Sequence, residues 1–202
     1  MHPKALGTLI GNFKKFPGVG EKSAQRYALW LLKQTEEDVN ALARSIVEAR
    51  QNLGHCPICF QFSQGGQTCP ICADPKRDQG VVCIIEEVKD LMAIETIGEY
   101  KGVYHILGGV ISPIDGIGPA QLNIVQLQKR VINADPKITE VILAINPSVE
   151  GETTSYYLGS LLNHLTIVSQ ISFGISLGSE LDQADPGTME RAFNHRRPLE
   201  SF

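Results

Sequence analysis

The chain has 202 residues, of which 43% are hydrophobic and 20% are charged, and these values are ordinary for a globular protein of one or two domains. Its 19 glycines and 11 prolines show no short period, which excludes a collagen-like or coiled-coil fibre, and no apolar run approaches the ~18 residues of a membrane-spanning helix. The first residues lack the apolar core of a secretory signal, so we expect a soluble cytoplasmic protein with no membrane partner.

Charge is unevenly distributed along the sequence. The formal net charge is −4. Residues 1–33 nevertheless hold six lysines and arginines against Glu21 alone, a local net of +5, whereas residues 81–202 have a net of −7. A polyanion responds to the local field within about 8–10 Å. The pattern therefore indicates a basic first domain that binds nucleic acid, on an acidic body.

Three amphipathic helices are predicted at the start of the chain, from apolar residues at helical spacing. The first lies around Leu6–Phe13, the second near Glu21–Lys33 and the third over Glu36–Leu53. Thr35, with an acidic residue three positions later, is a typical N-cap for the third helix.

The turn between the first two helices is a candidate nucleic-acid site. Gly18 and Gly20 allow a tight hairpin and the close approach of another backbone. Free amides at the start of the second helix favour an anion, and Lys22 and Arg26 are four residues apart, on one helix face. We interpret these four residues as a phosphate clamp for a nucleic-acid backbone; the alternative is an ordinary helical hairpin with solvated charges.

Four of the five cysteines have the spacing C-x2-C-x9-C-x2-C, as Cys56, Cys59, Cys69 and Cys72. Two such turns supply the four soft ligands of a tetrahedral zinc ion and leave no open position, so the metal would be structural, one Zn²⁺ per chain. A redox pair or four unmetallated thiols are the alternatives. Cys83 stands alone in an apolar run and is interpreted as a core residue.

From Gly80 onward, strands alternate with helices, which predicts a parallel α/β sheet with helical crossovers. The strands are expected at Val81–Ile85, Val103–Leu107, Glu140–Ile145 and Thr166–Ile171. The helices are expected at Val88–Ile97, Ala120–Asn133 and Thr153–His164, with a short helix at Thr188–His195.

Acidic residues lie at the predicted strand ends, where open α/β sheets build sites. Glu86 follows the first strand, and Glu150 and Glu152 come after the third. A Mg²⁺-dependent phosphoryl-transfer site would need a further carboxylate pair, but Asn146-Pro147-Ser148 follows the third strand instead. We therefore interpret the three glutamates as a surface for a partner and predict no catalytic residues.

The ordered set of motifs resembles the RecR family of bacterial recombination mediators over essentially the whole chain. The resemblance rests on Phe16–Gly20 with Lys22–Arg26, the four cysteines, Gly98–Gly109, Ser112–Pro119 and Asn146–Glu152. It implies a helix-hairpin-helix region (1–54), a four-cysteine zinc finger (55–76), a Toprim domain (80–175) and a C-terminal segment (176–202).

The resemblance also implies a function. Members of this family are not enzymes; they act with RecO, and in some settings RecF, to load the RecA recombinase at single-strand gaps in nucleoid DNA, and they form homodimers or ring-like homotetramers. By the same resemblance, Lys22 and Arg26 contact duplex, gapped or junction DNA, and Glu86, Glu150 and Glu152 face RecO.

Two other functions are compatible with parts of the sequence. One is a Mg²⁺-dependent Toprim nuclease or primase-like phosphoryl transferase that uses Glu86, which the Asn146-Pro147-Ser148 sequence disfavours. The other is a zinc-bearing RNA-binding protein of the translation apparatus, which the acidic body disfavours.

Overall fold

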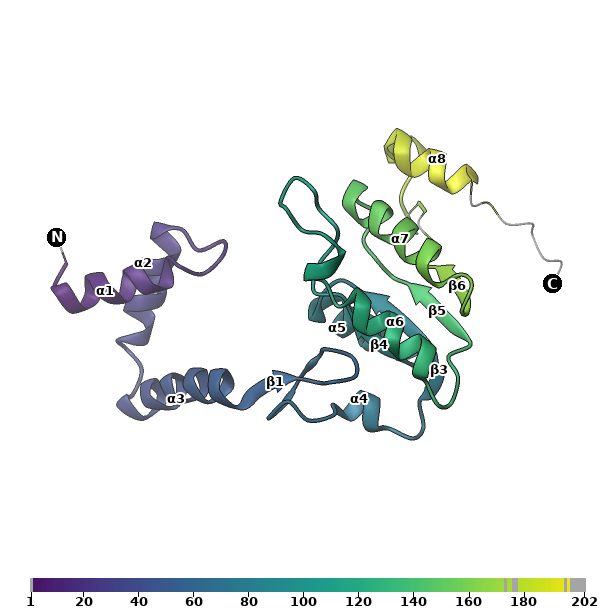
Figure 1. Cartoon of the computed structure of the whole chain (residues 1–202). Coiled ribbons are helices and arrows are strands. Elements are labelled where there is room, and N and C mark those ends of the chain that lie inside the picture. The colour runs from purple at the N-terminus through teal and green to yellow at the C-terminus, as the bar shows by residue number, and fades with distance from the viewer. Residues whose placement is uncertain (1, 173, 176–177, 195, 197–202) are drawn as a thin grey trace. The chain divides into compact units, whose positions relative to one another are not determined.

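A computed structural model of the chain describes residues 2–172, 174–175, 178–194 and 196 (Figure 1). The chain forms two compact units, and the boundary between them in the sequence lies between Leu53 and Gly54. The fold is mixed α/β, with N-terminal helices, a cysteine cluster and a parallel sheet, as the sequence predicts. No helix among the described residues has the length and apolar character needed to cross a bilayer.

The first unit consists of helices α1 (Lys4–Phe13), α2 (Glu21–Leu31) and α3 (Glu36–Asn52). Small residues let α1 and α2 approach closely, and their shared core contains Ile10, Ala24 and Ala28. The predicted cap of α3 is confirmed, because the Thr35 hydroxyl accepts a hydrogen bond from the Asp38 amide at 3.1 Å.

Three short elements that the sequence analysis did not anticipate follow, the first of them crossing the boundary into the second unit. Strands β1 (Leu53–His55) and β2 (Phe62–Gln64) pair with each other, and helix α4 (Pro70–Ala73) begins directly after Cys69, the third cysteine of the quartet. The polar composition of this segment gives no periodic signal, because its only buried cluster is the four cysteines with Ile71 packed against them.

The main sheet has four parallel strands in the order β4-β3-β5-β6. Their bounds are β3 Asp78–Ile85, β4 Gly102–Ile106, β5 Glu140–Leu143 and β6 Ile167–Gln170. The predicted parallel sheet is confirmed, and it reflects the continuous apolar run of a strand that is buried on both faces.

Helices cover both faces of this sheet and create two cores. Helices α6 (Ile124–Asn133) and α7 (Val149–Leu162) pack on one face, over Val82 and Ile84 (Figure 1). Helix α5 (Val88–Ile97) and the cysteine segment (residues 55–76) pack on the other face, which contains the predicted core residue Cys83. The cysteine segment is therefore part of the second unit's core.

Two predicted helix starts are wrong. The stretch expected to open α6 at Ala120 is instead a 3-10 turn, η1 (Pro119–Gln121), followed by extended backbone at Leu122. Helix α7 begins at Val149 rather than Thr153, because the Ser148 hydroxyl caps it by accepting from the Gly151 amide at 3.0 Å.

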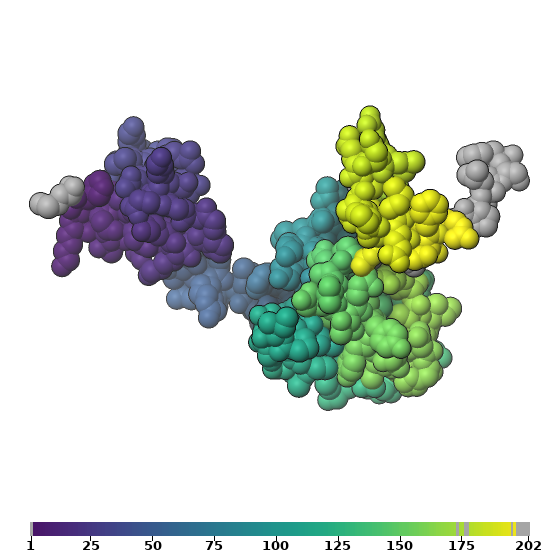
Figure 2. All heavy atoms as spheres, turned by 90° about the horizontal axis from the view of Figure 1, so that it is seen from above, coloured from purple at the N-terminus to yellow at the C-terminus, as the bar shows by residue number. Residues whose placement is uncertain are grey.

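The C-terminal part contains a 3-10 turn, η2 (Leu181–Gln183), and helix α8 (Pro186–Asn194). The helix was predicted at Thr188–His195, and His195 lies outside the described residues. Arg191 of α8 pairs with Glu152 of α7 at 2.9 Å, which places α8 beside α7 on the surface of this unit (Figure 2).

Candidate nucleic-acid interface and metal centre

The hairpin between α1 and α2 exposes the start of α2. Gly18 has φ +74°, a left-handed conformation that favours glycine, and the Val19 amide donates to the Phe16 carbonyl oxygen at 3.1 Å to close the turn. Helix α2 then begins after Gly20 without a side-chain cap, and a Cβ added at Gly20 would meet no atom within 4 Å. The start of α2 therefore has no side-chain cap, and uncapped amides at a helix start favour an anion.

Both predicted cations lie on this helix and are exposed. Lys22 and Arg26 are one turn apart on α2, and the Arg26 guanidinium lies 5.5 Å from the centre of the Tyr27 ring. Glu21, the sole acidic residue before residue 34, is held by Lys14 at 2.6 Å, and this contact lowers the pKa of the Glu21 carboxyl group. The acid is thus neutralised locally, and the face carrying Lys22 and Arg26 stays positive.

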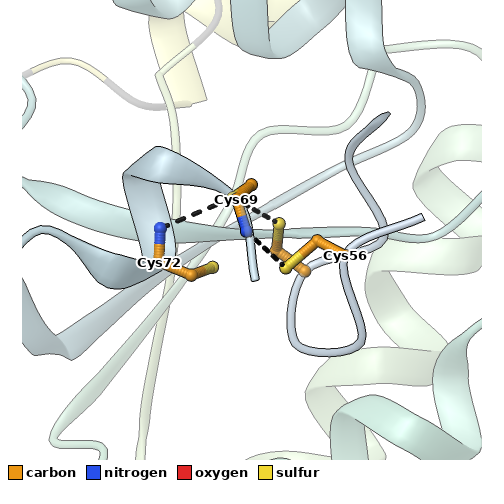
Figure 3. Close-up of side chains that lie close together, drawn as sticks. Cys56, Cys69 and Cys72 are labelled. Atoms are coloured by element: carbon orange, nitrogen blue, oxygen red, sulfur yellow. Dashed lines mark hydrogen bonds between the residues drawn. The ribbon is translucent and has the colours of Figure 1, made fainter. Parts of the chain in front are cut away.

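The four predicted zinc ligands meet at one point. The Sγ atoms of Cys56, Cys59, Cys69 and Cys72 all lie within 4.8 Å of one another, and these residues are buried. The Cys69 amide points at the Cys56 sulfur at 3.4 Å, and the Cys72 amide points at the Cys69 sulfur at 3.5 Å (Figure 3). None of the five cysteines forms a disulfide.

The thiols of the quartet influence one another strongly. A hydrogen bond from Cys72 lowers the pKa of the Cys59 thiol to about 5, whereas burial raises the pKa of Cys69 to about 11. The neighbouring thiols thus favour the thiolate form of the buried Cys59 sulfur. Four close, buried sulfurs with inward amides are a donor set that fits a tetrahedral zinc ion, whose charge would keep all four as thiolates.

His55 does not join the quartet. Its Nδ1 atom lies 2.9 Å from the Phe60 carbonyl oxygen, and its ring stacks on Phe62. These contacts occupy the ring of the residue next to Cys56, so His55 is not a fifth member of the cluster.

The three predicted glutamates lie near the carboxyl ends of β3 and β5 but are engaged separately. Glu86 Oε1 accepts from the Asn146 amide at 2.6 Å, Glu152 pairs with Arg191, and Glu150 lies in the first turn of α7. Within the part of the chain that the structure describes, the cysteine quartet is the single group of three or more potential ligands close enough to hold a metal.

Sequence reasoning missed the residue that links the cysteines to the sheet. Arg130 of α6 donates through Nη1 to the Tyr104 carbonyl oxygen at 2.6 Å and to the Ile58 carbonyl oxygen at 3.4 Å. Ile58 lies between Cys56 and Cys59 in the sequence. The Ile106 amide also donates to the Cys59 carbonyl oxygen at 2.9 Å. Nothing local distinguishes Arg130 from a solvated helix cation, so no signal in the sequence would have found it.

Sequence reasoning also missed a hydrogen-bonded group around Arg77, which directly follows the cysteine segment. Arg77 donates to Glu95 of α5 at 2.9 Å and to the Gly102 carbonyl oxygen at 3.1 Å, and the Tyr104 hydroxyl also donates to Glu95. This half-buried network ties the end of the cysteine segment to α5 and β4.

Family models match three parts of the chain. A model described as "RecR, helix-hairpin-helix" matches residues 6–50, a Toprim domain matches residues 80–172, and "RecR, C-terminal" matches residues 174–197.

Curated relatives match the chain almost end to end. The chain is 50% identical over 200 residues to the recombination protein RecR of Gloeothece citriformis, with 99% of both chains covered. It is 48% identical to that of Acaryochloris marina, covering 99% of this chain and 98% of the relative, and 46% identical to that of Prochlorococcus marinus, covering 97% of each.

Proposed function

This chain belongs to the RecR family of recombination proteins, and on that premise we propose that it is a non-catalytic, DNA-binding mediator of recombinational repair. In this role it acts in the cytoplasm on nucleoid DNA, with RecO and RecF, and helps the RecA recombinase to load at single-strand gaps. Its parts would be the DNA-binding region (1–54), the zinc finger (55–76), the Toprim domain (80–175) and the C-terminal segment (176–202).

The uncapped, exposed start of α2 carries this proposal. Backbone amides there and the side chains of Lys22 and Arg26 would bind phosphate oxygens, while Gly18 and Gly20 let the sugar-phosphate chain approach closely. Such contacts position a protein on DNA without reading base sequence. This suits a protein that acts at gaps of any sequence.

A single hairpin offers few phosphate contacts, so we propose that the protein binds as a dimer or a ring-like tetramer. Helix α3 supports assembly, because it buries none of its own residues and leaves apolar side chains exposed. These include Leu42, Ile46 and Val47, with Ile46 60% exposed. Several hairpins directed at one duplex would raise the avidity ~100-fold or more. Light scattering with and without gapped DNA tests this assembly.

We further propose that one structural Zn²⁺ occupies the cysteine quartet, and that Glu86, Glu150 and Glu152 form a surface for RecO. The absence of carboxylates at Asn146-Pro147-Ser148 supports a partner-binding rather than a catalytic role for this edge. An assay for Mg²⁺-dependent cleavage or synthesis, with Glu86→Gln as control, would expose a residual phosphoryl-transfer activity.

Substitution of both cations tests the DNA-binding role. We expect Lys22→Ala with Arg26→Ala to abolish binding to a fluorescent gapped duplex at moderate salt. Each cation that contacts a phosphate releases a counterion and so favours binding, and the double variant loses both contacts. Lys4→Ala with Lys33→Ala is the matched control, since it removes two exposed charges from the same unit. Metal content should be unchanged in both variants. Wild-type affinity in the Lys22 and Arg26 double variant would refute the proposal.

A further inference from the structure

A pocket of about 480 Å³ lies between the cysteine segment and the carboxyl ends of β3 and β4. Apolar and aromatic side chains form much of its wall, namely His55, Phe60, Phe62, Val88 and Ile106. Its volume is within the range of ligand-binding pockets, and the carboxyl ends of parallel strands are where such sheets bind ligands. Neither the DNA clamp nor the metal centre uses it.

The pocket wall is preformed. The His55 and Phe62 rings stack with centres 5.1 Å apart, and the bond from His55 to the Phe60 carbonyl fixes the loop between them. The hydrogen bond between Ile106 and Cys59 holds the same loop to β4. Phe62 is nevertheless 51% exposed, so this apolar wall faces solvent in the isolated chain.

The rim of the pocket is acidic. Glu87 and Lys89 line it and pair with each other at 2.8 Å, so they cancel. Glu86, the residue before Glu87, adjoins the pocket through its backbone, since its carbonyl oxygen accepts from the amide of the lining residue Gly108 at 2.9 Å, and its carboxylate accepts from the Asn146 amide. Asp90 accepts from the Glu87 amide at 2.9 Å and thereby occupies the start of α5 with its own carboxylate. With the lining pair neutral, the carboxylates of Glu86 and Asp90 beside it leave a net negative local charge, which disfavours a phosphate and favours a cation.

We propose that this pocket docks a protein partner by receiving one bulky apolar side chain, while a neighbouring basic side chain of that partner pairs with the acidic rim. The apolar wall favours the bulky apolar side chain, and the net negative rim favours the basic side chain beside it. The inference rests on the partner-binding role proposed for Glu86, and it adds the apolar anchor. Single-stranded DNA, whose bases would also stack on Phe62, is disfavoured by the same carboxylates.

Two probes test the pocket on the full-length, metal-loaded protein by calorimetry: RecO, and a short peptide with one tryptophan between two lysines. Phe62→Ser should weaken binding of each probe at least tenfold, and Glu87→Gln a few-fold. Ile114→Ser is the control, because Ile114 is 92% exposed in the same unit and lies outside the pocket wall. It should bind both probes as the wild type does. A peptide with serine in place of tryptophan should bind the wild type at least tenfold more weakly.

The outcomes separate this inference from the proposed function. If Phe62→Ser binds RecO and the peptide normally, the pocket inference is wrong while the RecO role stands. If the wild type ignores RecO, the RecO role is wrong and the tryptophan peptide alone decides the pocket. If an oligothymidine binds the wild type but not Phe62→Ser, the pocket is a base-stacking site and the inference is overturned.

Discussion

Arg130 connects the cysteine quartet to the sheet, and its replacement by methionine is the sharpest test of that connection. Strand β4 is an outer strand of the sheet, and the Tyr104 carbonyl on its free side is bonded by Arg130 at 2.6 Å. The same guanidinium nitrogen contacts the Ile58 carbonyl at 3.4 Å. Burial lowers the pKa of Arg130, and the thiols of Cys72, Cys59 and Cys56 act in the opposite direction.

The cost of Arg130→Met follows from these contacts. A hydrogen bond from a charged donor contributes about 1.5–3 kcal/mol, and the Tyr104 carbonyl would be left without this donor. The longer contact to Ile58 adds less. We expect the free energy of unfolding to fall by about 2–4 kcal/mol, which for a unit of this size lowers the melting temperature by roughly 5–15 °C.

Arg130→Met should also release bound zinc faster than the wild type does. A zinc ion held by four thiolates would carry a net charge of −2, and Arg130, on which three of these cysteines act electrostatically, would offset part of it. The assay is urea unfolding by circular dichroism together with zinc transfer to a colorimetric chelator in native buffer. Arg130→Lys keeps the charge but loses the planar donor, so it should release zinc more slowly than Arg130→Met. A wild-type urea midpoint and zinc-transfer rate in Arg130→Met would refute the reasoning.

Two further predictions concern the second unit's core. Gly151→Ala should cost about 2 kcal/mol or more, because its Cβ would lie 2.0 Å from the Asn146 carbonyl oxygen. Gly159→Ala, in the same helix with no atom nearer than 3.7 Å, should instead stabilise by about 0.5–1 kcal/mol; equal urea midpoints for the two variants would contradict this. Burial lowers the pKa of His105 to about 4, so the unfolded chain binds the proton first and stability is lost as pH falls below about 6.5. Between about pH 7.5 and pH 6 the wild type should lose about 1 kcal/mol more than His105→Gln, and parallel stability curves would exclude this role.

The sequence was most informative where a pattern is local. The apolar run Val81–Ile85 predicts a buried parallel strand, and the cysteine spacing predicts the quartet, because both patterns lie within one short stretch of sequence. Helix α7 was placed too late, since Pro147 and Gly151 look like helix breakers. In the fold, Gly151 is needed because the helix start passes close to the Asn146 carbonyl.

Contacts between distant segments could not be predicted. Arg130 lies 72 positions from Ile58, and Phe62 becomes a pocket wall only when its loop packs on β4. Both residues look ordinary in sequence, one as a helix cation and the other as an apolar residue in a polar stretch. Their roles arise from how the cysteine segment docks on the sheet, which no periodicity encodes.

This docking gives the cysteine quartet a structural role that is separate from the proposed DNA-binding residues of α2. The outer side of β4 would otherwise present unpaired groups, and an open strand edge promotes aggregation. Here Cys59 accepts from the Ile106 amide, Asn123 donates to the Ile106 carbonyl at 2.9 Å, and Arg130 covers Tyr104. The cysteine segment has almost no core of its own, so the sheet edge and a bound metal would each stabilise it, and it in turn covers the edge. Metal loss should therefore damage the second unit first, whereas substitutions at the α2 turn should abolish DNA binding and leave that unit intact.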